Sequence, residues 1–487
     1  MSRPSRRHVC TSCGAAAAKW VGRCASCGEW NSLVEEQAEV RGRPSSRWSP
    51  AGRSEEAGLR PVRLPRVDPE AARPFATGLS ELDRVLGGGL TPGSVTLLGG
   101  EPGIGKSTLV LQAVAAAAST GRSSLIIAAE ESAEQVRQRS ARLGVLEEEC
   151  FVLSTSDLLA SIEGADQVRP GLLVIDSIQT VSDPGISSPA GSPNQVRGCA
   201  QLLVQYAKAT GTATVLVGHV TKDGSLAGPR TLEHLVDTVL SFEGDRHHSL
   251  RALVATKHRF GPAGELGLFE MREEGLASVE DPSAFLLGDR RPGVPGTVAV
   301  PVLEGRRPLV VEMQALLAET RNPPRRVVQG VSSARVALLL AVLERSCGAQ
   351  VAGADVFVST VGGIKVSEPA ADLGVLCAMA SAFTGIPLPH DAVLFGEVGL
   401  AGELRQVSRF ERRLSEAARL GFRRALVPAA TPERSAPAGL ELERLASVEE
   451  AVRSLGILTA LGRPLATSTS TGRGAPTTAL ARMSHSG

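Results

Sequence analysis

Short apolar runs alternate with longer segments of helical character through the first half of the chain. The runs cover residues 95–99, 124–129, 172–175 and 214–217, and none contains a charged residue. Residues 108–118, which follow the first run, contain neither Gly nor Pro, and the same holds for 133–143 after the second. Buried strands that alternate with helices are typical of parallel sheets. The pattern therefore predicts an α/β domain.

A glycine-rich stretch joins the first apolar run to its helix. Residues 100–107, GEPGIGKS, fit the pattern G-x-x-x-x-G-K-[ST]. The backbone N–H groups of such a loop cradle phosphates, and the helix N-terminus adds partial positive charge. Lys106 would reach the β- and γ-phosphates of ATP, and the Ser107 hydroxyl would bind Mg²⁺. The predicted nucleotide-binding residues are Gly100, Glu101, Pro102, Gly103, Ile104, Gly105, Lys106, Ser107 and Thr108.

Carboxylates follow two of the other apolar runs. Glu130 and Glu131 come directly after residues 124–129, and Asp176 comes directly after residues 172–175. A carboxylate at this place could polarise an attacking water, and the glutamates could also cap the next helix. Four apolar residues before Asp form the Walker B pattern, which predicts that Asp176 holds Mg²⁺ through water.

Four cysteines near the N-terminus have the spacing C-x2-C-x10-C-x2-C. Cys10, Cys13, Cys24 and Cys27 can converge as thiolates on one Zn²⁺. A pair of redox dithiols is the alternative, but two such pairs in a polar module favour metal. We therefore predict a C4 zinc ribbon over residues 8–33, which is too small to bury a core and would fold on its metal.

Composition limits the remaining segments. Residues 34–66 lack apolar periodicity and residues 461–487 are rich in Ser, Thr, Gly and Ala, so we expect a flexible linker and a disordered tail. The net charge of +1 indicates neither nucleic acid nor membrane as a partner. No run of 18 apolar residues and no signal peptide is present, so we expect a cytoplasmic protein without a membrane partner.

A second group of cations follows a predicted hairpin. The β-rich runs 236–242 and 250–256 are separated by polar residues and followed by Lys257-His258-Arg259-Phe260-Gly261. Two cations and an aromatic residue at a strand end suit a phosphate of DNA or of a neighbouring subunit's nucleotide. The alternative is an ordinary solvated strand end.

In this order, the cysteine ribbon, the phosphate loop and the K-x-R-F-G box resemble the RadA (Sms) family of bacterial DNA-repair ATPases. Residues 327–455 are similar to the proteolytic domain of Lon, with VGGIK at 361–365 and GEVGLAG at 396–402. The resemblance implies a RecA-like P-loop ATPase core at 67–282. It also implies a C-terminal α+β Lon-protease-like domain at 283–460.

The resemblance implies a DNA-dependent ATPase of homologous recombination and repair. Such a protein promotes branch migration or unwinding on single-stranded and branched DNA, as a hexameric homo-oligomer with RecA as partner. ATP, Mg²⁺ and Zn²⁺ are the implied cofactors. By similarity to RecA-type rings, Lys257 and Arg259 are implied to reach the ATP of the next subunit, while His258 replaces the Asn usual in the family.

The Lon-like region lacks the protease's reactive groups. Ala370 occupies the position of the nucleophilic serine, and the lysine position falls near Glu411. A Ser-Lys mechanism needs a hydroxyl and an amine, so we predict a non-proteolytic domain. Its basic residues form either a DNA-facing surface or a charged helix face: Lys365, Arg405, Arg409, Arg412 and Arg413.

Two other functions stay open. One is an ATP-dependent Ser-Lys protease, which Ala370 opposes. The other is a KaiC-like regulatory ATPase that acts as a protein-binding scaffold, because residues 75–90 and the Glu130-Glu131 pair resemble that branch too. Stimulation of ATP hydrolysis by DNA would separate the scaffold from the repair enzyme.

Overall fold

The computed structural model describes residues 6–10, 16–26, 28, 30, 33–37, 63–218, 231–244, 249–320, 322–351, 353–432 and 436–461. The chain divides into two compact units, Met1–Gly288 with Leu303–Leu309 and Asp289–Val302 with Val310–Gly487. Most of the predicted linker and tail, together with Cys13 and Cys27, lies outside the described residues. Across the described ranges, no helix has the length and hydropathy that a membrane span requires.

The N-terminal segment forms a small antiparallel sheet. Its strands are β1 (Arg6–Cys10), β2 (Ala16–Ala17) and β3 (Leu33–Gln37), with β1 in the centre. Cys10, Cys24 and Leu33 are buried together and make up its described core. So small an apolar cluster stabilises little by burial, which agrees with a fold that depends on metal.

Within the described residues, the first unit is built on a nine-stranded sheet in the order β12-β11-β10-β9-β4-β8-β7-β5-β6. The apolar runs predicted as strands are confirmed, and they are parallel to one another. The parallel strands are β4 (Val95–Gly100), β5 (Ser124–Ala128), β6 (Cys150–Leu153), β7 (Leu172–Asp176), β8 (Ala213–Val217) and β9 (Thr238–Glu243). The antiparallel strands are β10 (Leu250–His258), β11 (Leu266–Arg272) and β12 (Gly275–Ser278).

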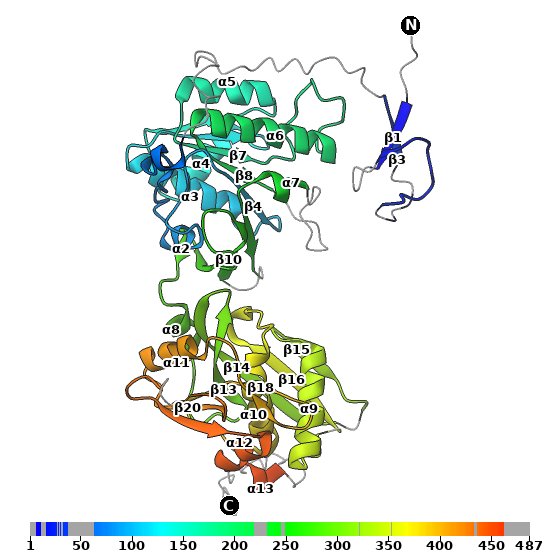
Figure 1. Cartoon of the computed structure of the whole chain (residues 1–487), viewed down its shortest axis with the longest axis vertical. Coiled ribbons are helices and arrows are strands. Elements are labelled where there is room, and N and C mark those ends of the chain that lie inside the picture. The colour runs from blue at the N-terminus through cyan, green and yellow to red at the C-terminus, as the bar shows by residue number, and fades with distance from the viewer. Residues whose placement is uncertain are drawn as a thin grey trace, which may run out of the picture. The chain divides into compact units, whose positions relative to one another are not determined.

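Helices cover both faces of this sheet (Figure 1). Successive strand residues point to opposite faces, so Leu98 joins a core with α3 and Leu97 joins a second core with α6. Both faces are therefore apolar, which explains the uninterrupted hydrophobic runs. The helices of this unit are α2 (Ser80–Val85), α3 (Lys106–Ser119), α4 (Ala133–Arg142), α5 (Leu158–Val168), α6 (Pro193–Thr210), α7 (Thr231–Leu235) and α8 (Pro282–Leu287), with 3-10 turns η1 (Leu64–Arg66) and η2 (Glu70–Ala72) before them.

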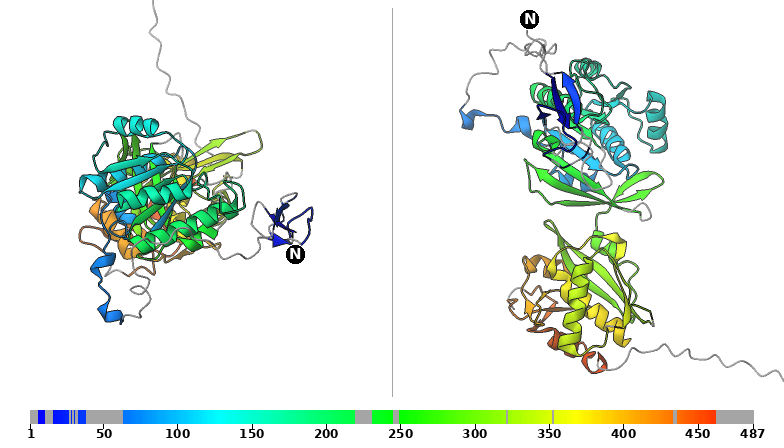
Figure 2. Two further views of the ribbon diagram at one scale, coloured as in Figure 1. Left: turned by 90° about the horizontal axis from the view of Figure 1, so that it is seen from above. Right: turned by 90° about the vertical axis from the view of Figure 1, so that its right-hand side faces the viewer.

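The second unit combines a mixed sheet with helices, and α9 (Ser333–Cys347) packs against α10 (Asp372–Thr384) (Figure 2). Its described strands follow the order β15-β16-β14-β13-β17-β20-β21. They are β13 (Thr297–Glu304), β14 (Arg307–Glu319), β15 (Arg326–Gln329), β16 (Ala354–Thr360), β17 (Ala392–Leu394), β20 (Arg424–Pro428) and β21 (Glu441–Leu445). The remaining elements are the β18 (Glu397–Val398) and β19 (Leu404–Arg405) pair, η3 (Val361–Gly363), η4 (Pro369–Ala371), α11 (Phe410–Arg419), α12 (Val448–Ser454) and α13 (Leu458–Leu461).

Candidate nucleotide site

The phosphate loop connects β4 to α3 and depends on glycine at two positions. Gly105 caps the N-terminus of α3 with φ +116°, and a Cβ there would lie 2.7 Å from the Met271 Cε atom. A Cβ on Gly100 would lie 2.5 Å from the Phe242 carbonyl oxygen. Only glycine fits both the backbone conformation and the close packing. The loop therefore turns tightly and leads directly into the helix N-terminus.

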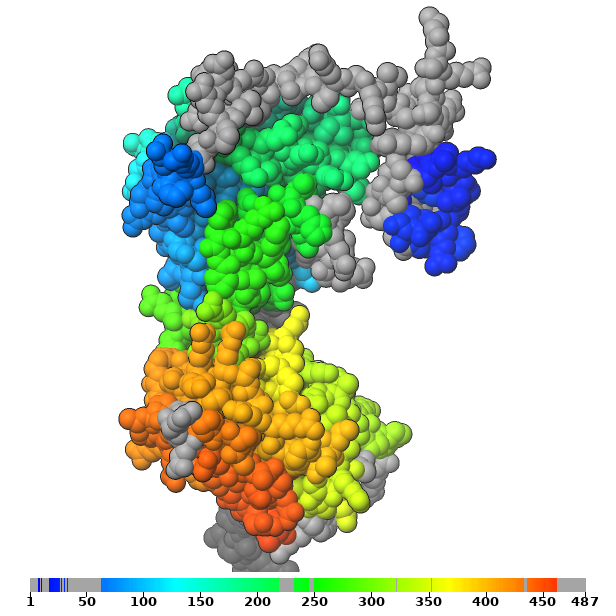
Figure 3. Space-filling model, viewed as in Figure 1, coloured from blue at the N-terminus to red at the C-terminus, as the bar shows by residue number. Residues whose placement is uncertain are grey.

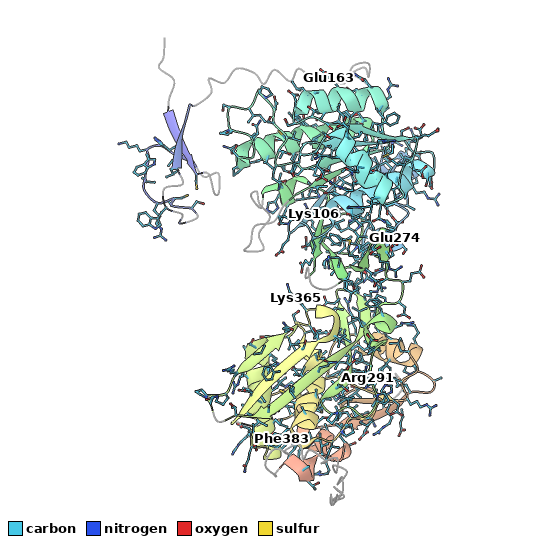
Figure 4. The ribbon with its side chains drawn as sticks, turned by 180° about the vertical axis from the view of Figure 1, so that it is seen from behind. Lys106, Glu163, Glu274, Arg291, Lys365 and Phe383 are labelled. Atoms are coloured by element: carbon cyan, nitrogen blue, oxygen red, sulfur yellow. The ribbon has the colours of Figure 1, made fainter. Side chains whose placement is uncertain are left out.

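Lys106 is the buried cation of this loop and is labelled in Figure 4. Its Nζ donates hydrogen bonds to the carbonyl oxygens of Gly100, at 2.8 Å, and Glu101, at 2.9 Å. Burial lowers the pKa of this ammonium, and the nearby charges of Asp176 and Glu130 oppose that shift. The side chain is thus folded back over its own loop, where a phosphate would find a desolvated positive charge.

Asp176 and Ser107 meet beside the loop. Asp176 ends β7, and the Ser107 hydroxyl on α3 forms a side-chain hydrogen bond to its carboxylate. Burial raises the pKa of Asp176, while the bond from Ser107 acts in the opposite direction. Ser107 and Asp176 line the same cleft. Carboxylate and hydroxyl oxygens are ligands that suit Mg²⁺, so these residues fit the predicted metal.

The two glutamates after β5 differ in their contacts. Glu130 accepts a hydrogen bond from the Ser177 hydroxyl, next to Asp176, whereas Glu131 forms an ion pair with Arg139 on α4. Ser132, not a glutamate, is the N-cap of α4, and it forms a capping box with Gln135. The capping role considered for the glutamates thus belongs to Ser132, and both carboxylates line the cleft.

Sequence motifs missed Arg139 and Ser177, which also belong to this neighbourhood. Arg139 lies about two helical turns beyond Ser132, on the face of α4 that carries Gln135 and Val136. That spacing could have predicted the contact, since it places Arg139 on the same helix face as the residue that follows Glu131. Ser177 carried no signal beyond its place after the Walker B aspartate.

The K-x-R-F-G box follows β10 and lies at the opposite end of the strands from the phosphate loop. His258 pairs with Thr238 across β10 and β9, and Thr238 pairs with Thr96 at the start of β4. Strand β4 needs about 13 Å to reach Gly100 from Thr96, at about 3.3 Å per residue. The fold therefore does not bring Lys257 or Arg259 to Lys106 of the same chain.

Both cations of the box have partners within their own unit. Lys257 Nζ donates to the carbonyl oxygens of Glu233, at 2.6 Å, and Val236, at 2.7 Å, at the end of α7. Arg259 pairs with Asp237 at 2.9 Å and keeps half of its side chain exposed. Burial lowers the Lys257 pKa. Of the two cations, the guanidinium is the more accessible to another molecule.

His258 occupies a structural position within the box. Its Nδ1 lies 2.9 Å from the Thr238 hydroxyl and its Nε2 lies 3.2 Å from the Leu86 carbonyl oxygen. Burial lowers the pKa of this imidazole. A neutral ring with one donor and one acceptor fits these two partners, as an amide side chain also would.

The described half of the cysteine set lies in the core of the ribbon. Cys10 and Cys24 are both buried. No cluster of metal-ligating side chains occurs among the residues whose positions are described, which leave out Cys13 and Cys27. The donor set itself, four thiols in two C-x2-C pairs, suits a tetrahedral Zn²⁺.

The second unit buries one residue of the predicted basic surface. Arg413 is fully buried, and it donates to the Glu368 carboxylate at 2.6 and 2.5 Å and to the Pro301 carbonyl oxygen at 2.9 Å. The prediction that Arg413 belongs to an exposed basic surface was therefore wrong, because Arg413 lies on the face of α11 that packs into the core. The other members are exposed: Lys365 lies shortly after η3, Arg405 lies on β19, and Arg409 and Arg412 lie at the start of α11, within the orange part of the chain in Figure 3.

The positions matched to the Lon dyad hold no reactive pair. Ala370 is buried and Glu411 is exposed on α11. The ionic groups near Ala370 are occupied with one another, since Arg413 binds Glu368 and Arg335 binds Asp372.

Two segments of the first unit match known protein families. Residues 75–163 match the family described as KaiC ATPase, and residues 8–35 match the family described as rubredoxin metal binding domain. The chain is 46% identical over 459 residues to DNA repair protein RadA of Mycolicibacterium smegmatis, covering 93% of this chain and 97% of that protein.

Two further relatives agree over nearly the whole chain. DNA repair protein RadA of Pseudomonas aeruginosa is 47% identical over 456 residues, covering 93% of this chain and all of that protein. The Bacillus subtilis protein is 44% identical over 460 residues, covering 94% of this chain and all of its own length. With a RecA-like ATPase core and a zinc ribbon, this chain is an ATP-hydrolysing enzyme and belongs to the RadA family of DNA repair proteins.

Proposed function

We propose that this protein is a DNA-dependent ATPase of homologous recombination and DNA repair. It would act on single-stranded and branched DNA and promote branch migration or unwinding of recombination intermediates together with RecA recombinase. The observation that carries the proposal is the convergence of Ser107, Asp176 and Glu130 in one cleft. The charges of Asp176 and Glu130 also act on Lys106 of the adjoining loop, and the chain is similar to DNA repair proteins over 93% of its length.

The residues of the cleft and of the phosphate loop would divide the chemistry among them. The loop amides and Lys106 would hold the phosphates of ATP, and Ser107 and Asp176 would hold Mg²⁺, which neutralises charge on the phosphates when bound. A carboxylate after β5 would orient a water and take its proton as the water oxygen attacks the γ-phosphorus. The bond to the β-phosphate oxygen then breaks and leaves ADP and phosphate.

The position of the K-x-R-F-G box supports an assembly of several copies. Lys257 and Arg259 lie across the sheet from their own phosphate loop, so they would meet ATP only on another copy. We therefore propose a homo-oligomer, a hexameric ring in which Arg259 and Lys257 approach the neighbour's nucleotide. A cation supplied in this way stabilises charge on the transferred phosphoryl group.

The domains on either side of the ATPase core would have binding and structural roles rather than catalytic ones. Cys10, Cys13, Cys24 and Cys27 would bind structural Zn²⁺ at residues 8–33. The domain at 283–460 would be a Lon-like module without proteolytic activity, because Ala370 offers no nucleophile.

The test is steady-state ATP hydrolysis with and without single-stranded and branched DNA across a salt series. Stimulation that fades as salt rises is expected, because phosphate contacts release counterions. Lys106→Ala serves as the catalytic control. DNA that leaves the rate unchanged at every salt concentration would contradict the proposal.

The match of residues 75–163 to KaiC favours one alternative, a regulatory ATPase that serves as a protein-binding scaffold. That protein would hydrolyse ATP at a rate that DNA does not change. The same assay therefore separates the two functions.

A further inference from the structure

The cleft contains one charged side chain to which the ATPase motifs assign no role. Of the described residues that line it, Glu130, Glu131 and Asp176 are anionic, and Arg139 is the cation among them. The Arg139 side chain is 20% exposed, and its guanidinium is paired with Glu131. The carboxylates around this arginine therefore differ in their partners.

The two glutamates point to different partners although they are adjacent in the chain. Glu130 is exposed and contacts Ser177, which brings it beside the predicted Mg²⁺ ligand Asp176. Glu131 is held by the guanidinium of Arg139. A carboxylate held in an ion pair is poorly placed to orient water. Glu130 also lies close enough to Lys106 for its charge to raise the pKa of that ammonium, so Glu130 is the better candidate for the reaction.

Helix α4 fixes the position of Arg139. The capping box of Ser132 and Gln135 starts the helix directly after the glutamates, and Val136 is buried in the core beneath it. Residues three or four apart share a helix face, so Ser132, Val136 and Arg139 face the same side. The Arg139 guanidinium is thus carried by a rigid helix, and it pairs with Glu131, the residue before the N-cap.

We propose that Arg139 is a positioning residue that assigns different roles to the two glutamates. It holds Glu131 and, through it, the short connection between β5 and α4, so that Glu130 alone orients the attacking water. The inference rests on the proposed ATP hydrolysis and names the residue that arranges that site. Arg139 itself touches neither ATP nor water.

The experiment compares ATP turnover by full-length variants in the presence of single-stranded DNA. Glu130→Gln, Glu131→Gln, Arg139→Gln, Arg139→Lys and the double variant Glu131→Gln/Arg139→Gln are measured for kcat and KM. Binding of a fluorescent ATP analogue is measured in parallel. Arg137→Gln is the matched control, because Arg137 lies exposed on the same helix outside the cleft.

Glu130→Gln should lower kcat by about 10²–10⁴-fold, as expected for a general base. Arg139→Gln and Glu131→Gln should each lower kcat by about 10–100-fold with little change in KM or analogue binding, the size typical of residues that orient a site from outside. The double variant should be no slower than Arg139→Gln, since the pair acts as a unit. Arg139→Lys should recover most of the activity.

Three results would overturn the assignment. The first is a Glu131→Gln loss as large as that of Glu130→Gln, and the second is an Arg139→Gln rate equal to that of Arg137→Gln. Loss of analogue binding together with kcat, unrescued by Arg139→Lys, would make Arg139 a merely structural residue and overturn it as well. Turnover at the wild-type rate in Lys106→Ala would instead contradict the nucleotide site itself, and the role of Arg139 would fall with it.

Discussion

One ion pair from each unit shows two different uses of charged residues. In the first, Glu131 and Arg139 line a cleft and remain 38% and 20% exposed. In the second, Arg413 is completely buried, and its donors are distributed over Glu368 and two backbone carbonyl oxygens. A charge that its own protein neutralises fully can stabilise a fold but has little left to offer a ligand. Chemistry is expected where charges converge beside an open cleft.

The strongest test of this contrast is Lys106→Ala in the first unit. The substitution should lower ATP turnover by about 10²–10³-fold or more, because it removes the charge aimed at the phosphates. Thermal stability should change little, since the hydrogen bonds that are lost join the ammonium to carbonyl oxygens of its own loop. Steady-state hydrolysis and thermal melting measure the two effects. Lys208→Ala, an exposed lysine on α6, is the control and should match wild type.

The reverse behaviour is expected from Arg413→Met in the second unit. It should lower stability by about 3–5 kcal/mol, because the Glu368 carboxylate loses its buried partner. ATP turnover below the melting transition should persist. Chemical denaturation measures the loss, and adding Glu368→Gln should recover part of it by removing the uncompensated charge. An unchanged denaturation midpoint would show that the pair contributes nothing.

The ribbon extends the comparison to a third case. Its described residues include only a small apolar cluster, and they include no buried ion pair like that of Arg413 with Glu368. Cys24→Ser should lower the zinc content, since the hydroxyl is a much poorer zinc ligand than the thiolate. Atomic absorption measures the bound metal, and Cys199→Ser, at a buried cysteine of α6, is the control. A Cys24→Ser protein that keeps the full wild-type zinc content would exclude this thiol as a ligand.

The smallest effect is expected from Ala370→Ser. A hydroxyl restored at this buried position should produce no proteolysis, because Glu411 provides no amine and lies exposed on α11. Stability should fall by only about 1 kcal/mol, the cost of one poorly satisfied hydroxyl. Casein degradation with ATP is the measurement. Turnover above the wild-type background would mean that the second unit retains protease chemistry.

Much of the site followed from local pattern. Uninterrupted apolar runs marked β4, β5, β7 and β8, because strands covered on both faces have no polar side. The carboxyl ends of parallel strands meet at one edge, so the residues after each run could be expected to lie together. Lys106, Asp176 and Glu130 do so. Glycine spacing was equally informative, since Gly105 adopts a backbone conformation that other residues rarely reach.

Pattern failed where the outcome depended on packing between distant elements. The basic segment of α11 gave no indication that Arg413 points inward, because its partner Glu368 lies 45 residues earlier and meets it only in the folded unit. The pairing of Glu131 with Arg139 likewise required the turn between β5 and α4 to be built first.

The order of residues alone determined the α/β core and predicted the phosphate loop, the Walker B aspartate and the four-cysteine zinc site, since each depends on short-range spacing. Tertiary structure decided which charges face solvent and which are buried. It also decided that Lys257 and Arg259 lie at the opposite end of the strands from Lys106, because β10 pairs antiparallel with β9. Pairing register and burial depend on contacts between elements far apart in the chain, which local spacing does not encode.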